Sequence, residues 1–214
     1  CGTNGFVIHS PLNELVVTAS SIDFTENTAG KACGGIDAQN CQSCQIEHVQ
    51  FTNSNSNPAF TITQADNAEA SLRINYCVFD GWLGTEKKSF EISIGSENFE
   101  FNHNILRNMI GSGPNNYFGS ININSKIRTF EINNMTFTDN QCKSLYSGGI
   151  GLLIEGINKL SFIDCKFLNN YAIQDTTQSR STDYYNGDGG GFQIGYLSTV
   201  NFIDVLFQNC QFKQ

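Results

Sequence analysis

Two acidic residues could carry out chemistry if the fold brings them together. Asp164 and Asp204 each lie three residues before an aromatic residue that recurs along the chain, Phe167 and Phe207. If the recurring segments stack as parallel strands, the two carboxylates come to lie roughly 5 Å apart. Retaining glycoside hydrolases use a carboxylate pair at that separation. In the other repeats the same position holds Ser21, His48, Tyr76, His103 and Asn134. This mixture favours a row of solvated bend residues over a catalytic pair.

The histidines form no further catalytic group. His48 and His103 are two repeats apart with Tyr76 between them, and His9 is isolated. No Ser-His-Asp arrangement can be built from the sequence. Residues 187–191 are rich in glycine, but they precede a predicted strand and not the helix N-terminus that a phosphate site requires. We therefore predict no catalytic residue.

A long polar insertion is the main candidate for binding. Residues 171–189 separate two predicted strands and are rich in Tyr, Asp and Asn. Aromatic rings with carboxylates and amides at their edges suit the binding of sugars. The predicted binding flank combines this insertion with aromatic residues of the corresponding bends: Trp82, Tyr117, Tyr146, Tyr171, Asp175, Asp183, Tyr184, Tyr185 and Asp188. The alternative, which we favour, is that the tyrosines only anchor the insertion to the body of the protein.

Two short patterns could bind a metal. Asp183 and Asp188 supply the carboxylate oxygens that calcium prefers, but their spacing matches no known calcium loop. Cys41 and Cys44 have the Cys-x-x-Cys spacing of zinc sites, but no second pair accompanies them. We therefore predict no cofactor, with calcium at the two aspartates as the alternative.

The cysteines indicate an oxidising compartment. Their even number, together with a composition rich in Ser, Asn and Gly, is typical of extracytoplasmic proteins. The eight are Cys1, Cys33, Cys41, Cys44, Cys77, Cys142, Cys165 and Cys210. The first three are expected to form disulfides near the start of the chain.

Three of the cysteines recur at inward-facing positions. Cys44, Cys77 and Cys165 are interpreted as small core hydrophobes. Cys77 and Cys165 lie three repeats apart, roughly 14 Å along a stacked structure. That distance is too long for a disulfide, which needs Cα atoms within about 7 Å. A bridge between Cys142 and Cys165, in adjacent repeats, remains open.

A repeat of about thirty residues must position these groups. Each unit contains two short alternating segments separated by a two-residue bend, and a third segment that starts near Gly or Ser. One position is always Phe or Leu, and its members recur every 27 to 40 residues. We predict that they form a core stack: Phe24, Phe51, Phe79, Leu106, Phe137, Phe167 and Phe207. Residues two, five and seven before them are also apolar, except for Asn104.

The pattern predicts an all-β fold, a single parallel β-helix of about seven coils over residues 1–214. Neither end of the sequence offers a polar or helical cap. We therefore expect a longer polypeptide, or neighbouring subunits that stack at the open ends.

Three units share the motif Phe-x-x-Asn followed by Gly-Gly-Ile or Gly-Gly-Phe. They are Phe24 to Asn27 with residues 34–36, Phe137 to Asn140 with residues 148–150, and Phe167 to Asn170 with residues 190–192. This motif resembles the repeat of the polymorphic-membrane-protein family of surface adhesins, within the pectin-lyase-like group of right-handed β-helices. The resemblance implies a right-handed solenoid, in agreement with the crossover rule. It also implies a location outside the cell or at its surface.

Charge excludes some partners. The net charge is −8 and only four arginines are present, so no basic surface for nucleic acid is expected. No apolar run approaches the roughly 18–20 residues of a membrane span. The only glycosylation sequon is at Asn134, which is expected to face outward.

Two functions follow from these patterns. The first is an extracellular structural or adhesive module of a surface protein or filament, with a flank for glycans or proteins. The alternative is a carbohydrate-active enzyme, a polysaccharide lyase or glycoside hydrolase of the pectin-lyase-like group. The motifs of polygalacturonases and the arginine pattern of pectate lyases are absent from the sequence.

Overall fold

The computed structural model describes most of the repeats. Its described residues are 14–17, 21–27, 36–54, 60–81, 83–84, 90–112, 121–125, 129–144, 150–154, 159–174, 192–196 and 204–213. Every regular element in these ranges is a β-strand. Neighbouring strands in each sheet run parallel, as in the pairs β4–β7 and β12–β16. The prediction of an all-β fold built from parallel strands is confirmed.

The strands form five sheets. The first contains β1 (Leu15–Val17), β4 (Ser43–Glu47), β7 (Ser71–Asn75) and β11 (Phe99–Asn102). A three-stranded sheet contains β15 (Thr129–Asn133), β19 (Lys159–Ile163) and β23 (Asp204–Gln208). The seven-stranded sheet contains β2 (Ser21–Asn27), β5 (Gln50–Ser54), β8 (Val78–Asp80), β12 (Ile105–Arg107), β16 (Thr136–Thr138), β20 (Lys166–Leu168) and β24 (Gln211–Lys213).

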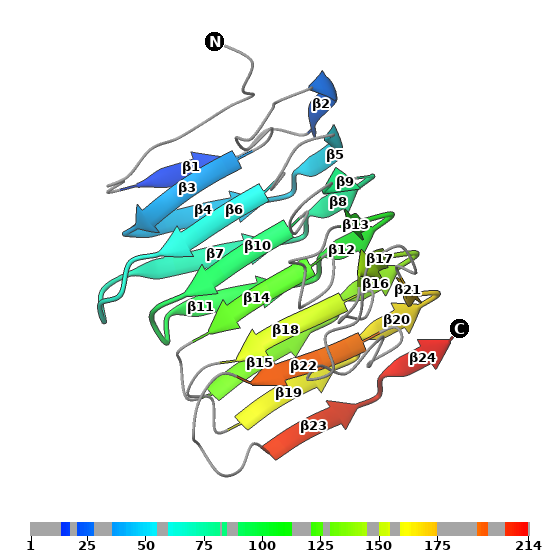
Figure 1. Cartoon of the computed structure of the whole chain (residues 1–214). Coiled ribbons are helices and arrows are strands. Elements are labelled where there is room, and N and C mark those ends of the chain that lie inside the picture. Colours follow the sequence, from blue (N-terminus) through cyan, green and yellow to red (C-terminus); the bar gives the residue numbers. More distant parts are fainter. Residues whose placement is uncertain are drawn as a thin grey trace, which may run out of the picture.

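The remaining two sheets complete the repeats. One contains β3 (Ile36–Cys41), β6 (Phe60–Gln64), β10 (Phe90–Ile94), β14 (Ile121–Ser125), β18 (Ile150–Ile154) and β22 (Phe192–Tyr196). The other contains β9 (Leu83–Gly84), β13 (Ile110–Ser112), β17 (Gln141–Ser144) and β21 (Tyr171–Gln174). Successive strands along the chain belong to different sheets, so each strand pairs with its counterpart one repeat away (Figure 1).

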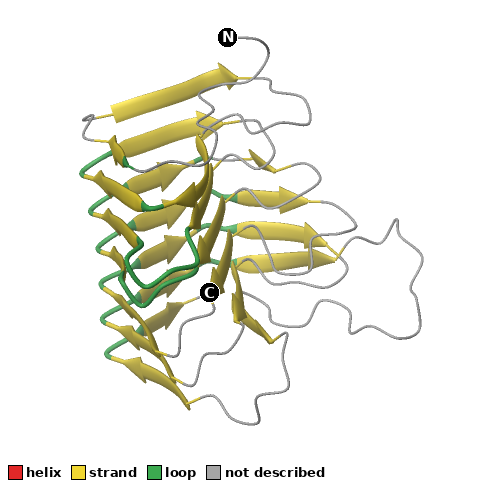
Figure 2. Cartoon of the chain, turned by 90° about the vertical axis from the view of Figure 1, so that its left-hand side faces the viewer, coloured by secondary structure: helices red, strands yellow, loops and turns green. Residues whose placement is uncertain are grey.

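Left-handed backbone conformations make the bend between the first two strands of each repeat. His48, Tyr76, His103, Asn134, Asp164 and Asn209 have φ between 53° and 58°. Each of the first five donates its N–H to a carbonyl of the next repeat; the His103 N–H, for example, lies 3.0 Å from the Asn133 oxygen. The ladder of hydrogen bonds therefore continues through the bend. Figure 2 shows short turns of successive repeats lying one above another.

The interior contains the central part of the predicted core stack. Phe51, Phe79, Leu106, Phe137 and Phe167 are in register across neighbouring strands and at most 4% exposed. The rings of Phe51 and Phe79 are stacked with centroids 5.0 Å apart, and those of Phe137 and Phe167 with centroids 5.2 Å apart. Five of the seven predicted members are therefore confirmed.

The two ends of the predicted stack are wrong. Ile22, and not Phe24, is the register partner of Phe51. At the other end Phe167 pairs with Phe212, whereas Phe207 pairs with Phe162. The last repeat has two phenylalanines five residues apart, as does the repeat before it, so the sequence permits either alignment. Continuous strand pairing selects the one that also brings Cys165 and Cys210 to the same position.

Buried asparagines satisfy the backbone where the chain turns. Asn140, from the Phe-x-x-Asn motif, accepts a hydrogen bond from the Met109 N–H at 3.0 Å and donates one to the Leu106 carbonyl at 2.9 Å. Asn104, the polar residue in an apolar column, accepts from the Cys77 N–H at 2.9 Å and donates to the Ile74 carbonyl at 2.8 Å. These side chains replace strand pairing at the bends, which is why polar residues belong in the core here.

One disulfide joins Cys41 and Cys44, with Cα atoms 6.1 Å apart. Both residues are buried, so the Cys-x-x-Cys pair is structural and is not a zinc ligand pair. Cys77 and Cys165 are buried free thiols, as expected of core residues. Because Cys165 is free, the bridge between Cys142 and Cys165 is not present. Cys1 and Cys33 lie outside the described residues.

Candidate functional site

The acidic pair suggested by the sequence does not form. Asp204 pairs in register with Lys159, at the start of β19. Asp164 lies in the following bend, where its N–H donates to the Gln208 carbonyl at 2.9 Å. Its counterpart in the next repeat is Asn209, which has the same left-handed conformation. The prediction of neighbouring Asp164 and Asp204 carboxylates is wrong because it rested on the misaligned last repeat.

Most of the predicted binding flank lies outside the described residues. This applies to Trp82, Tyr117, Tyr146, Asp175, Asp183, Tyr184, Tyr185 and Asp188, and therefore to the proposed calcium pair. Tyr171 is described. It begins β21, its side chain is 39% exposed, and its N–H donates to the Asn140 carbonyl at 3.0 Å.

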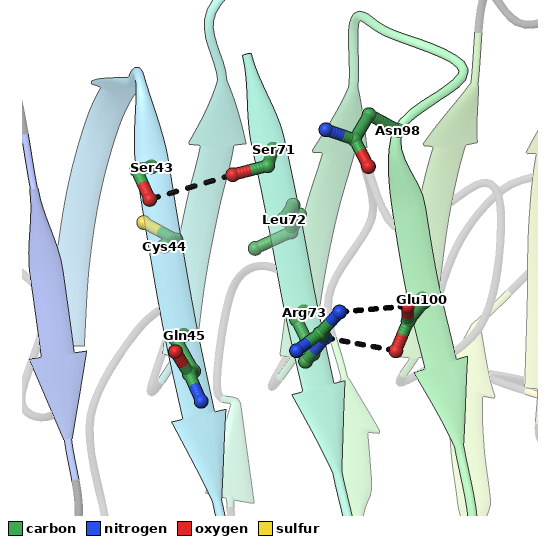
Figure 3. A pocket seen from close by; sticks show the side chains of 8 residues that line it. All are labelled: Ser43, Cys44, Gln45, Ser71, Leu72, Arg73, Asn98 and Glu100. Carbon is green, nitrogen blue, oxygen red and sulfur yellow. Dashed lines mark hydrogen bonds and ion pairs between the residues drawn. The ribbon is translucent and has the colours of Figure 1, made fainter.

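A shallow groove crosses three neighbouring strands, β4, β7 and β11 (Figure 3). We call it the β7 groove. Its volume is about 240 Å³, and its lining consists of Ser43, Cys44, Gln45, Ser71, Leu72, Arg73, Asn98 and Glu100. Cys44 and Leu72 are buried, in keeping with the alternation of each strand. The surface presented to solvent is therefore made by hydroxyl, amide, guanidinium and carboxylate groups.

Strand register arranges these polar groups in rows across the strands. Ser43 is paired with Ser71, and their hydroxyls are 3.4 Å apart. In the next row Gln45, Arg73 and Glu100 are consecutive partners. Outward-facing residues two apart on parallel strands produce such rows automatically, at the strand spacing of about 4.8 Å. A polar group is thus presented at each repeat along the stacking direction.

An ion pair fixes the centre of the groove. The Arg73 Nη2 and Nε lie 3.0 and 2.9 Å from the two carboxylate oxygens of Glu100, so the contact is bidentate. Asn75 Nδ2 donates to the same carboxylate at 3.0 Å, and Glu47 lies 3.9 Å from Arg73 on the other side.

These contacts determine the protonation state of Glu100. Burial raises the pKa of this carboxyl, but hydrogen bonds from Arg73 and Asn75 and the charge of Arg73 outweigh it and lower the pKa below 4.5. The same hydrogen bond and charge raise the pKa of Arg73. Glu100 is therefore ionised at neutral pH, so it can accept hydrogen bonds from a ligand but cannot act as a general acid.

A column of aromatic rings borders the same sheet. His48, Tyr76 and His103 follow β4, β7 and β11 at the left-handed bend. The Tyr76 ring is stacked on His48 with centroids 4.9 Å apart and on His103 with centroids 4.5 Å apart. All three side chains are exposed, and Tyr76 is 51% exposed. The spacing of these residues predicted no joint site, whereas in the structure their rings stack into one continuous edge.

The β7 groove and the aromatic column beside it were not predicted, although the sequence contains a pattern that indicates them. His48, Tyr76 and His103 occupy one column of the repeat, and polar residues precede them by three and by five positions in each of the three repeats. The composition of the insertion at residues 171–189 instead favoured that segment as the binding site.

Other functional features of the described residues are limited. No three His, Cys, Asp or Glu side chains gather into a metal site in this part of the chain. No helix in the same ranges is long and apolar enough to cross a membrane. Asn134 is exposed at its bend, with its N–H bonded to the Ile163 carbonyl at 2.9 Å, so its side chain is accessible as a glycosylation acceptor. Glycosylation itself stays a prediction.

No protein-family model, no curated protein and no solved structure matches this chain.

Proposed function

We propose that this chain is an extracellular adhesive module that binds an extended glycan along the β7 groove. In this proposal the repeats are about seven coils of a right-handed parallel β-helix, a rigid scaffold of the kind found in surface adhesins. The single observation that carries it is the combination of polar rows on β4, β7 and β11 with the exposed column of His48, Tyr76 and His103.

The chemistry of the groove suits a sugar chain better than other ligands. Hydroxyls, an amide and an ionised carboxylate offer donors and acceptors to sugar hydroxyls, and exposed aromatic edges offer apolar contact. Because the strands lie about 4.8 Å apart, a polymer lying across them would meet a polar group on each of three successive coils, as in the row of Gln45, Arg73 and Glu100. The net charge of −8 argues against nucleic acid as the polymer.

The protonation state of Glu100 favours adhesion over catalysis. Hydrolysis of a glycan needs one carboxyl held protonated near neutral pH and a second carboxylate close to it. In the groove, the Glu100 carboxyl is held ionised by Arg73 and Asn75. The Cys41–Cys44 disulfide supports a location in an oxidising compartment, which is where a surface module would work.

The test is glycan binding by wild-type protein and matched arginine variants. Arg73→Ala removes the centre of the groove and is expected to weaken binding about tenfold or more, the equivalent of one charge-assisted hydrogen bond. Arg107→Ala is the control, because Arg107 forms a similar ion pair with Asp80 at 2.7 Å in another sheet. Tyr76→Ala is expected to weaken binding as well.

Equal binding by the Arg73 and Arg107 variants would contradict this site, and so would a screen in which no glycan binds. Cleavage of a bound glycan, detected as new reducing or unsaturated ends, would favour the enzymatic alternative. In that case Asp183→Asn and Asp188→Asn would be the next variants to measure.

A further inference from the structure

Two free cysteines occupy the same position in the last two described repeats. Cys165 precedes β20 and Cys210 precedes β24, and these strands pair with Lys166 opposite Gln211. The Gln211 N–H donates to the Cys165 carbonyl at 2.9 Å, so the main chains are direct neighbours at the cysteines. At the parallel strand spacing of about 4.8 Å, their Cα atoms lie within the roughly 4.4–6.8 Å range of disulfides.

The two thiols also have the same local environment. Cys165 Sγ lies 3.4 Å from the Ile163 carbonyl and 3.6 Å from the Ile132 carbonyl. Cys210 Sγ makes the equivalent contacts one repeat later, 3.5 Å from the Gln208 carbonyl and 3.4 Å from the Phe162 carbonyl. Equivalent contacts mean that the two side chains leave their strands in the same direction and lie one above the other.

Exposure differs between the two thiols. Cys165 is fully buried, whereas Cys210 is only partly buried, next to strands that are exposed over their whole length. Burial is the main cause that raises the pKa of the Cys165 thiol to about 11. An oxidant from solvent therefore reaches Cys210 first, and Cys165 is placed to react second.

We propose that Cys165 and Cys210 are a redox pair that forms a disulfide between adjacent repeats. With a low-molecular-weight disulfide as oxidant, the Cys210 thiolate attacks one of its sulfurs, forms a mixed disulfide and releases one small thiol. Cys165 then loses its proton and attacks Cys210 Sγ, which releases the second small thiol. Two protein thiols are oxidised, and one small disulfide is reduced to two thiols.

The bond would link β23 and β24 covalently to the preceding repeat. Strands β23 and β24 have paired neighbours on one side only among the described strands, and Phe212 is 58% exposed. A covalent link from Cys210 to the buried Cys165 restrains both strands, since Cys210 lies between them in the chain. Oxidation thereby changes the stability of this end without altering the β7 groove on β4, β7 and β11.

Cys77 is a matched control inside the same molecule. It occupies the same position of its repeat, lies 3.3 and 3.5 Å from two carbonyl oxygens, and its thiol pKa is likewise raised to about 11, mainly by burial. Its neighbours in the adjacent repeats are Val49 and Asn104, so it has the environment of Cys165 without a partner thiol. Any difference in oxidation between Cys77 and Cys165 therefore reports on Cys210.

The experiment treats the full chain with oxidised glutathione, quenches with acid, unfolds the protein and alkylates the remaining thiols before peptide mapping. We expect a cross-linked peptide containing Cys165 and Cys210 that lacks two hydrogens, with Cys77 alkylated. Cys210→Ser should leave Cys165 as alkylatable as Cys77, and Cys77→Ser should leave the cross-link unchanged. Hydrogen exchange in β23 and β24 should slow on oxidation of the wild-type protein, and not in Cys210→Ser.

Two results would overturn the proposal. One is equal alkylation of Cys165 and Cys77 after oxidation of the wild-type protein. The other is a cross-link from Cys210 to Cys1, Cys33 or Cys142, since it would show that proximity to Cys165 does not select the partner. A cross-link without slower exchange would contradict the fastening of the terminal strands.

Discussion

Buried asparagines form hydrogen bonds to the backbone that the sequence motif alone does not reveal. In the Phe-x-x-Asn motif, Asn140 and Asn170 lie buried one above the other, with Asn140 Nδ2 donating to Asn170 Oδ1 at 2.8 Å. Asn170 in turn donates to the Phe137 carbonyl at 2.9 Å. The motif could suggest a surface site, since Asn is usually exposed. Here it marks the places where a side chain completes the backbone hydrogen bonding of the core.

Replacing Asn140 tests this role. Asn140→Ala leaves the buried Met109 N–H without this partner and removes a hydrogen bond to the buried Leu106 carbonyl, so we expect a loss of roughly 2–4 kcal/mol in the free energy of unfolding. Chemical denaturation measures it. The control is Asp139→Gly, because Asp139 is exposed with φ of 57°, which glycine adopts without strain. A loss below about 1 kcal/mol for Asn140→Ala would contradict the role.

Glu100 gives a prediction about pH. Its lowered folded-state pKa means that its contribution to stability is present above about pH 4.5 and is lost as the pH falls through the folded value. An NMR titration should place the Glu100 pKa below 4.5 in the wild-type protein. In Arg73→Gln the main favourable partner is gone while burial persists, so the pKa should rise. An unchanged pKa would show that the bidentate contact is not maintained in solution.

At the scale of the elements, the left-handed bends decide where the strands end. Residues such as His103, Asn134 and Asp164 adopt a conformation that costs most residues about 1–2 kcal/mol, and each recovers a hydrogen bond to the next repeat. The sequence predicted a polar, outward-facing column, and the structure has it at His48, Tyr76, His103, Asn134 and Asp164. Ser21 and Asp204, the predicted ends of that column, pair instead with Gln50 and Lys159. The sequence could not reveal the stacking of His48, Tyr76 and His103, because that depends on the common backbone conformation.

A substitution at one bend tests its conformation. Asn134 has φ of 53° and an exposed side chain. Asn134→Val introduces a β-branched residue that this conformation tolerates poorly, so we expect a loss of about 1–2 kcal/mol in the free energy of unfolding. Asn134→Gly should be close to neutral, because glycine adopts the same φ freely. Both variants lack the glycosylation site equally, so a similar stability for the two would count against a strained bend.

The register of the elements was predictable in the middle of the chain and not at its ends. Between Phe51 and Phe167 the alternation of several columns leaves one alignment, and the structure has it. In the last repeat, Phe207 and Phe212 offer two alignments with equal hydrophobic matching. Only the pairing of β23 with β19 and of β24 with β20 distinguishes them. The error carried over directly to the candidate site, since it created the apparent Asp164–Asp204 pair.

At the scale of the whole molecule, each repeat depends on its two neighbours. The ring of Phe137 is covered on one side by Phe167 and on the other by Leu106. Phe212, in contrast, contacts Phe167 and is 58% exposed. Stability in such stacked arrays is close to a sum over neighbouring contacts. The position of a residue along the chain should therefore determine how much its substitution lowers the free energy of unfolding.

Two matched substitutions measure this gradient. Phe137→Ala should cost about 3–5 kcal/mol, as for a fully buried phenylalanine. Phe212→Ala should cost about 1 kcal/mol, because much of its surface is already exposed. Hydrogen exchange should likewise be slower in β16 than in β24. Equal costs for the two substitutions would mean that the exposed end is covered in the protein in solution.

The candidate site was the least predictable part, for a physical reason. The β7 groove is assembled from outward residues of β4, β7 and β11, each of which is ordinary in its own strand. Its properties arise from lateral register, through contacts such as Arg73 with Glu100, 27 residues apart. Local composition, which highlighted the insertion at residues 171–189, carries no information about such contacts.

The in-register pairing of every repeat with the next has a consequence for engineering. Removal of one complete unit, for example residues 79–105, would join Val78 to Leu106, which then takes the position of Phe79 in the ladder. Each later strand then stays opposite an equivalent one. Each excision of a whole unit should shorten the protein by about 4.8 Å along the stacking direction, so the length of the scaffold could be set in equal steps.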